Sequence, residues 1–317
     1  MVKRTTIVDI AREAKVSVST VSKALMDAPD ISYKTKCLIR KTAEELGYVQ
    51  NLNAASLKSG SSKMIGILCD SLLNPYYNEI IYYLEILLSE KNYTVVIYRS
   101  NELNMKIYNN MISRNLEGLV SFLTPDSEVE RCLQNHSFPA VIIGRKSNYV
   151  SSVYMDDEKI GCLAAEYLLK QNVKKPIYIG EFKGLDISIL RGKGFKDRMI
   201  KDNIEPILFF NERDQHIKVL LDSIKNDELL NCDSIFCFSD IIAFEVMNVL
   251  SKIGKKDIPI IGVDNIHAEI PLPFSMLSVG ANKKNIAKKA IKFLLDQING
   301  INNDVQVYVE EVYFSSF

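Results

Sequence analysis

The stretch TTIVDIAREAKVSVSTVSKAL, residues 5–25, places two helix-start signals within a dozen positions. Thr6, with Asp9 three positions later, forms a start similar to a capping box, and Ser17 is a fresh N-cap for a second helix. Apolar residues follow each cap at helical spacing, at positions 7, 10, 11 and 14 and then at 18, 21 and 25. The first helix must end near Lys15. The pattern therefore predicts two short helices joined by a tight turn.

A third helix is predicted from Ser32 to about Leu46, with Gly47 as a left-handed cap. Its inward residues would be Leu38, Ile39, Ala43 and Leu46. Two short helices with a third that closes their core form a helix-turn-helix unit.

The outward face of the second helix carries small hydroxyl side chains and one cation, namely Ser19, Thr20, Ser22 and Lys23. No acidic residue lies between positions 17 and 27, so this face can enter a major groove and reach base edges. The alternative is a solvated helix face, although such faces usually mix both signs of charge. The pattern favours DNA binding.

The opening stretch, with ISYKTKCLIRKTAEELGYVQN at 31–51, resembles the DNA-binding head of the LacI/GalR family of bacterial transcription regulators. Three positions depart from the family pattern, because Lys15 replaces a glycine, Lys23 an arginine and Gln50 a proline. The resemblance implies a DNA-binding domain at 1–48. It also implies that the residues of this domain that contact DNA are Thr6, Ser17, Val18, Ser19, Thr20, Ser22 and Lys23.

The segment 49–63, which includes NLNAASLKSGSSK, would form a hinge helix and linker. In the family this helix forms only on DNA, where two copies enter the minor groove. The chain's own sequence allows this, because fewer than about a dozen residues do not hold a helix alone in water. The resemblance implies contacts from Asn51, Ala54, Leu57 and Lys58, with Leu57 as a wedge between base steps. The alternative is a plain linker.

Charge is unevenly distributed along the chain. Residues 1–60 contain ten Lys or Arg against six Asp or Glu, whereas the whole chain of 317 residues is neutral. A basic head on an acidic body suggests that the head meets a polyanion. Six scattered cysteines, the lack of an apolar leader and the lack of a long apolar run predict a cytoplasmic protein without a membrane span.

From Met64 onward, short apolar β-branched runs such as MIGILCD and IPIIGVD alternate with amphipathic helical patterns. This alternation predicts an α/β fold with parallel sheets covered on both faces. The core at 64–317 would form two Rossmann-like lobes, similar to periplasmic binding proteins. We expect an N-lobe at about 64–157 plus 283–302 and a C-lobe at about 158–282 plus 303–317.

Motifs typical of enzymes are missing from this core. No GxxxxGK[ST], GxGxxG after a strand, or GxSxG occurs, and the three histidines are far apart in sequence. We therefore expect no catalytic residues, no cofactor and no metal site. A free-standing sugar receptor would share the core, but it would need an export signal and no basic head.

The resemblance to the family continues through the core and implies a binding site for a small-molecule effector between the lobes. The residues that match family positions for effector contacts are Tyr76, Tyr77, Arg145, Arg191, Asp240 and Asp264. The alternatives are that the two tyrosines pack the following helix, and that the two aspartates cap helices or form ion pairs between the lobes. One arginine and two aspartates would suit a polyol.

The resemblance thus implies a regulator, commonly a repressor, that binds a pseudo-palindromic operator as a homodimer. A sugar is the favoured effector, while a purine or another metabolite acting as a co-repressor is the alternative. The polar stretch FFNERDQHIK at 209–218, where sugar-binding relatives commonly have an aromatic wall, leaves the effector open.

Overall fold

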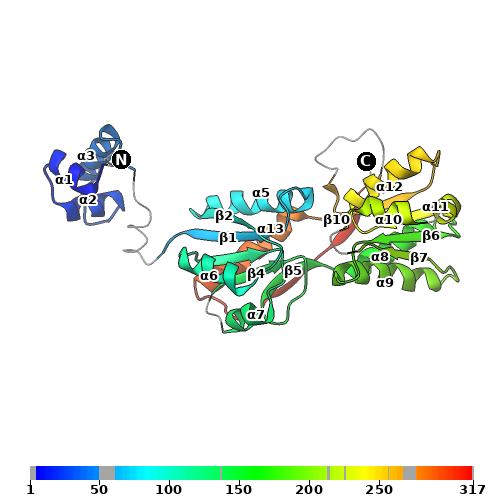
Figure 1. The fold of residues 1–317 in the computed structure, drawn as a ribbon. Coiled ribbons are helices and arrows are strands. Elements are labelled where there is room, and N and C mark those ends of the chain that lie inside the picture. Colours follow the sequence, from blue (N-terminus) through cyan, green and yellow to red (C-terminus); the bar gives the residue numbers. More distant parts are fainter. Residues whose placement is uncertain are drawn as a thin grey trace. The chain divides into compact units, whose positions relative to one another are not determined.

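The computed structural model describes residues 5–49, 61–135, 138–212, 215–224, 226–255, 257–266 and 276–315. The chain divides into two compact units, Met1–Ser62 and Lys63–Phe317. The first unit is a helical head, and the second contains two lobes that are each built around a six-stranded sheet (Figure 1).

The head contains α1 (Ile7–Glu13), α2 (Val18–Leu25) and α3 (Tyr33–Glu45). The Asp9 carboxylate accepts hydrogen bonds from the Thr6 N–H at 2.9 Å and from the Thr6 hydroxyl at 2.7 Å. Ser17 Oγ accepts one from the Thr20 N–H at 3.0 Å. Lys15 ends the first helix in a left-handed conformation, with a φ of 54°. The predicted helix-turn-helix unit is thus confirmed.

The core of the head lies between the three helices. Ile10, Val21 and Ile39 are fully buried there, and Ala43 packs beside them. The prediction that Leu38 points inward is wrong, because its side chain is 48% exposed. Leu38 is rotated by about 100° from Ile39 around the helix axis, and it lies outside the face of α3 that carries Ile39, Thr42 and Ala43.

The first lobe contains a parallel sheet in the order β11-β5-β4-β3-β1-β2. Its strands are β1 (Met64–Cys69), β2 (Thr94–Arg99), β3 (Gly118–Ser121), β4 (Ala140–Ile143), β5 (Ser151–Met155) and β11 (Val307–Glu310). One face is covered by α5 (Pro75–Ser89) and α13 (Lys283–Ile298), and the other by α6 (Met105–Ser113) and α7 (Ser127–Gln134). Alternation along β1 serves both faces, since Ile67 packs toward α5 and Leu68 toward α6.

The second lobe has the sheet order β12-β10-β9-β8-β6-β7, parallel except for β12. Its strands are β6 (Pro176–Gly180), β7 (Ile207–Phe210), β8 (Ser234–Cys237), β9 (Ile260–Val263), β10 (Leu277–Ala281) and β12 (Val312–Ser315). One face packs against α8 (Asp157–Leu169) and α9 (Asp186–Ile200). The other packs against α10 (Ile217–Ser223), α11 (Asn226–Asn231) and α12 (Asp240–Lys252). The predicted α/β architecture with two lobes is confirmed.

The chain passes between the lobes at Asp156, Asn282 and Glu311. One predicted boundary is wrong, because the segment 303–317 does not lie wholly in the C-lobe. β11 pairs in parallel with β5 of the first sheet, from Val307 beside Ser152 to Glu310 beside Met155. β11 thereby forms hydrogen bonds with an edge of β5 that would otherwise be unpaired. Within the segment 303–317, only β12 joins the second sheet.

Candidate functional site

The candidate DNA-contacting residues of the head lie on and around α2. Ser17, Ser19 and Lys23 are exposed, and Val18 is 39% exposed despite its apolar side chain. Thr20 and Ser22 are half-buried. An exposed valine at the start of such a helix offers an apolar contact, such as a thymine methyl group in a major groove.

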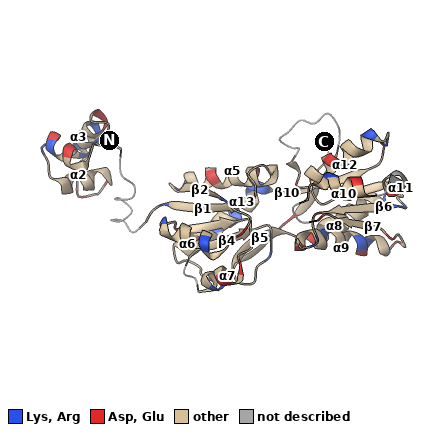
Figure 2. Ribbon diagram, in the orientation of Figure 1, with Lys and Arg blue, Asp and Glu red and all other residues tan. Residues whose placement is uncertain are grey.

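Several polar groups of this surface already have partners within the head. The hydroxyls of Ser17 and Thr20 lie 2.8 Å apart, and Thr6 donates to Asp9, so Ser17 and Thr6 also cap helices and the Thr20 hydroxyl contacts one of the caps. Lys23 Nζ lies 2.5 Å from Asp30 Oδ2 in the connection between α2 and α3. Figure 2 shows acidic as well as basic positions on the head. The predicted contacts Asn51, Ala54, Leu57 and Lys58 lie outside the described residues.

In the second unit, a buried ion pair lies where the two lobes meet. Arg191 on α9 donates from Nε to Asp157 Oδ1 at 2.8 Å and from Nη1 to the Phe238 carbonyl at 2.5 Å. Its guanidinium carbon lies 4.6 Å from the centre of the Phe238 ring. Arg191 is 3% exposed, and among the described residues Nη2 has no hydrogen-bond partner. Burial raises the pKa of Asp157, and the Arg191 charge opposes this rise.

The close approach of α8 and α9 brings this pair together. A Cβ atom added at Gly161 would lie 2.0 Å from the Arg191 carbonyl oxygen, and one at Gly194 would lie 2.0 Å from the Glu158 carbonyl oxygen. Only glycine fits at either position. The two glycines therefore set the spacing of the helices that place Arg191 beside Asp157.

Asp264 follows β9 and differs from the other buried acids. It is 9% exposed, has a φ of 100°, and its carboxylate has no donor among the described residues. Burial raises its pKa to about 7, while Arg191 acts in the opposite direction. A buried, unpaired carboxylate on a strained backbone is costly to the fold, so it is a strong candidate for contact with a ligand.

The prediction that Asp240 contacts an effector is not supported. Its side chain is fully buried, Oδ2 accepts from the Ile266 N–H at 2.9 Å, and Oδ1 accepts from the Ser278 hydroxyl at 2.7 Å. It begins α12 directly after the capping residue Ser239. Asp240 therefore joins α12 to the segments at β9 and β10, a structural role that differs from both the helix cap and the ion pair between the lobes considered for it.

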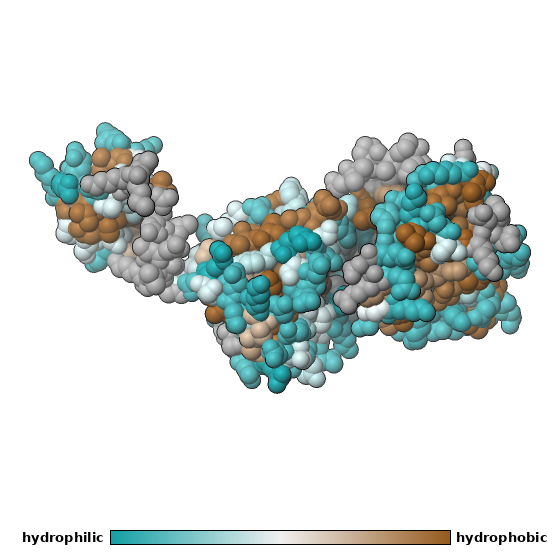
Figure 3. All heavy atoms as spheres, in the orientation of Figure 1, coloured by the Kyte–Doolittle hydropathy of each residue, from teal (hydrophilic) through white to brown (hydrophobic). Residues whose placement is uncertain are grey.

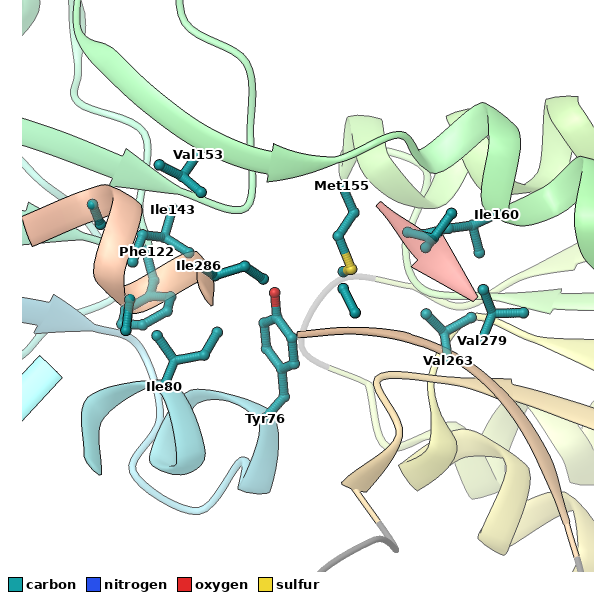
Figure 4. Packing of buried hydrophobic residues seen from close by; sticks show 14 of the residues in the cluster. Tyr76, Ile80, Phe122, Ile143, Val153, Met155, Ile160, Val263, Val279 and Ile286 are labelled. Atoms are coloured by element: carbon teal, nitrogen blue, oxygen red, sulfur yellow. The ribbon is translucent and has the colours of Figure 1, made fainter. Parts of the chain in front are cut away.

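Tyr76 and Tyr77 lie in the first turn of α5, which begins at Pro75 after the N-cap Asn74. Their rings are 5.8 Å apart, and Tyr77 also lies 4.8 Å from the Phe122 ring. Figure 4 shows Tyr76 where the lobes meet, with Ile80 of the first lobe on one side and Val263 of the second on the other. Burial and then the Asp264 charge raise the pKa of Tyr76. The structure thus brings Tyr76, Asp264 and Arg191 together.

Arg145 follows β4 and donates from Nη1 to Thr124 Oγ1 at 3.1 Å. Its charge acts on Tyr77, so it borders the same group of residues. Sequence reasoning missed Asp70, which directly follows β1 and has a buried Oδ1 without a partner. Its position at the carboxyl end of a strand was the available signal.

Sequence reasoning also missed Lys283. This buried lysine, at the start of α13, forms an ion pair with Glu79 of α5 and donates to the Asn265 carbonyl at 3.0 Å. It thereby connects the first lobe to the turn that carries Asp264.

Two further observations concern the described parts of the chain. No group of three or more His, Cys, Asp or Glu residues there is arranged to hold a metal ion. None of the helices there has both the length and the apolar content that crossing a bilayer requires.

A helix-turn-helix head joined to a two-lobed α/β core defines a class of ligand-responsive DNA-binding proteins. Residues 6–51 match the model of the bacterial regulatory proteins of the lacI family. Residues 165–313 match the periplasmic binding protein-like domain. The chain belongs to the lacI family, and it is a DNA-binding transcriptional regulator.

Known relatives match over almost the whole chain. The transcriptional regulator MalR of Clostridium butyricum is 27% identical over 329 residues, which cover 96% of each chain. The lac repressor dimer, solved with operator and the anti-inducer ONPF, superposes with a TM-score of 0.84 at 18% identity, over 98% of each chain. A regulator from Alkaliphilus metalliredigens QYMF, solved with D-xylulofuranose, has a TM-score of 0.70 at 23% identity, over 80% of this chain and 97% of that one.

Proposed function

We propose that this chain is a cytoplasmic transcriptional repressor that binds a pseudo-palindromic operator as a homodimer and is controlled by an uncharged sugar. The sugar would lie where the lobes meet, against Tyr76, Tyr77, Arg191 and Asp264, with Asp70 and Arg145 at the border. The observation that carries the proposal is the buried Asp264 carboxylate, which has no donor among the residues that the structure describes, near an arginine whose charge Asp157 already balances.

The charges of this group favour a neutral ligand over an anionic one. Arg191 forms its ion pair within the protein, which leaves the N–H groups on Nη2 as donors but little uncompensated positive charge. Asp264 and Asp70 offer acceptors, and a phosphate or carboxylate on the ligand would be repelled by them. Hydroxyl groups that donate to Asp264 would stabilise its ionised form. Tyrosine rings suit the apolar face of a sugar.

A solved relative supports a sugar as the class of effector, since the Alkaliphilus metalliredigens regulator holds D-xylulofuranose. Operator binding as a dimer is the arrangement in the lac repressor structure. In this chain, apolar side chains are exposed near α5 and on β2, including Leu73 at 90%, Tyr82 at 59% and Ile97 at 46%. Figure 3 shows hydrophobic residues gathered along α5. Such a surface is suited to a subunit interface.

A thermal-shift screen of the full-length protein tests the effector class. The panel contains neutral pentoses, hexoses and disaccharides, the matching sugar phosphates, and purine bases. We expect stabilisation by members of the neutral class alone, because a ligand at a hundredfold its Kd adds about 2.7 kcal/mol. Stabilisation by sugar phosphates or purines would contradict the proposed class, and consumption of the bound ligand would indicate an enzyme.

Selection from a library of random DNA duplexes tests operator binding independently. We expect the full-length protein to enrich a sequence with two inverted half-sites, and the stabilising sugar to change its affinity for that sequence. Enrichment of no sequence would contradict specific DNA binding whatever the screen finds.

A further inference from the structure

The connection between α2 and α3 carries two carboxylates that bind cations of both helices. Asp30 Oδ2 lies 2.5 Å from Lys23 Nζ of α2. Asp27 Oδ1 lies 3.1 Å from Lys36 Nζ and 2.9 Å from Arg40 Nη2, both on α3. The two acids therefore have separate partners, and only Asp30 acts on the helix that faces DNA.

Lys23 is the single basic residue of α2. Its side chain is 46% exposed, so the ammonium group is accessible to a groove. An unpaired lysine at such a position would bind any phosphate, because it is a point charge on a flexible stem. Asp30 removes this option in part, because its negative charge offsets that of the ammonium group, so the pair neutralises a phosphate less and releases fewer of the counterions condensed on DNA.

An ammonium group has three N–H donors. One can stay on Asp30 while the others reach acceptors on a base, and guanine presents N7 and O6 side by side in the major groove. The negative charge of Asp30 disfavours a nearby phosphate but not a neutral base edge. The hydrogen bond from Lys23 lowers the pKa of Asp30.

We propose that Asp30 is a specificity-determining positioning residue that holds Lys23 for a base edge and keeps it from binding phosphates at any sequence. The proposal rests on the assignment of α2 as the helix that enters the major groove. It extends the set of residues that control DNA recognition from α2 to the connection that follows it.

The test uses the full-length protein and its variants Asp30→Asn, Asp27→Asn, Lys23→Gln and Lys23→Gln/Asp30→Asn. Affinity for a random-sequence duplex is measured by fluorescence anisotropy across a range of salt concentrations. Asp27→Asn is the matched control, because it changes the net charge of the same connection equally. Asp30→Glu retains the carboxylate, and circular dichroism melting establishes that each variant folds.

We expect Asp30→Asn to bind the random duplex about threefold to tenfold more tightly, with a salt slope steeper by about 0.9 as one more phosphate contact forms. This gain should vanish in the double variant, whereas any gain in Asp27→Asn should not depend on Lys23. In selection from random duplexes, Asp30→Asn should lose preference at one position per half-site. Asp30→Glu should behave like the unchanged protein.

Two results would overturn the proposal. One is an Asp30→Asn variant that enriches the same bases with the same preference at every position. The other is a gain on the random duplex that persists when Lys23 is replaced. Failure of the unchanged protein to enrich any sequence would instead remove the assignment of operator binding, on which this inference rests.

Discussion

Arg191 Nε donates to Asp157 Oδ1 at 2.8 Å, and the two side chains are only 4% and 6% exposed. A second ion pair, Lys193 with Glu158, joins the same two helices at the same distance of 2.8 Å, but its side chains are 53% and 47% exposed. The two pairs differ chiefly in how far their side chains are exposed to water. Comparing them therefore separates the effect of burial on stability from the effect of pairing opposite charges.

Replacing Asp157 by asparagine should destabilise the core far more than replacing Glu158 by glutamine. The first change leaves a buried guanidinium without its counter-charge, which typically costs about 3–5 kcal/mol. The second removes an exposed pair that contributes less than about 1 kcal/mol. Urea unfolding followed by circular dichroism measures both losses. Equal losses would show that the burial of Arg191 carries no special cost.

Asp264→Asn should stabilise the protein at high pH while weakening sugar binding. The folded-state pKa of Asp264, about 7, lies above the ordinary aspartate value of 3.8, so the folded chain holds the proton more tightly. For this group stability therefore falls as the pH rises from about 4 to about 7. The variant should gain of the order of 4 kcal/mol at pH 8 and less than half of that at pH 5, where only part of the interval between the two pKa values has been crossed.

Melting temperatures of the unchanged protein and of Asp264→Asn at pH 5 and pH 8 check this prediction. Asparagine tolerates a positive φ, so the backbone strain at this position stays similar. The exposed Asp304, replaced by asparagine, is the control and should show no such pH dependence. A gain of the same size at both pH values would mean that the charge of Asp264 is not its source.

Much of the fold could be predicted because short stretches of sequence determine where many of its helices and strands lie. The caps Thr6, Ser17 and Ser32 precede apolar residues at helical spacing, and each begins a helix in the structure. Strands buried on both faces, such as β1 and β8, stand out as continuous apolar runs. The predicted lobe of β11 is wrong. The partner of a short strand with alternating exposure depends on contacts with residues far away in the sequence.

The candidate site could be predicted only in part, for a similar reason. A family pattern identified Arg191 and Asp264, but it could not show that Asp157 already pairs with the arginine. The burial that separates Asp240 from Asp264 arises from the packing of α12 on β9 and β10. Both aspartates follow strands, and their sequence context is alike. The structural role of Asp240 and the ligand-binding role proposed for Asp264 differ only in the hydrogen-bond donors that the fold places around each carboxylate.

Replacing Gly161 or Gly194 by alanine should destabilise the core, although alanine normally favours a helix over glycine. At both positions the added Cβ would lie 2.0 Å from a carbonyl oxygen of the facing helix, so α8 and α9 must move apart. Overpacking of this kind costs about 1–3 kcal/mol. Each variant should also bind the sugar more weakly, because Arg191 moves with α9. Lys193→Ala on the exposed side of α9 is the control for urea unfolding and calorimetry, and a stabilised Gly161→Ala variant would contradict the prediction.

The ion pair between Lys283 and Glu79 should respond unequally to the loss of either partner. Lys283 is 4% exposed and Glu79 is 21% exposed, so the glutamate can regain water more easily than the lysine. Glu79→Gln leaves a buried ammonium with the Asn265 carbonyl and should cost about 3 kcal/mol or more. Lys283→Met should cost less, and adding it to Glu79→Gln should restore part of the loss.

Chemical unfolding of the two single variants and the double variant measures these differences as a double-mutant cycle. Lys292→Met removes an ion pair with Asp296 on the same helix, α13, where the lysine is 62% exposed. It should change stability by less than about 1 kcal/mol, because exposed pairs contribute little. If Lys283→Met proved more costly than Glu79→Gln, the contacts of the lysine stem, and not the buried charge, would hold this connection between the lobes.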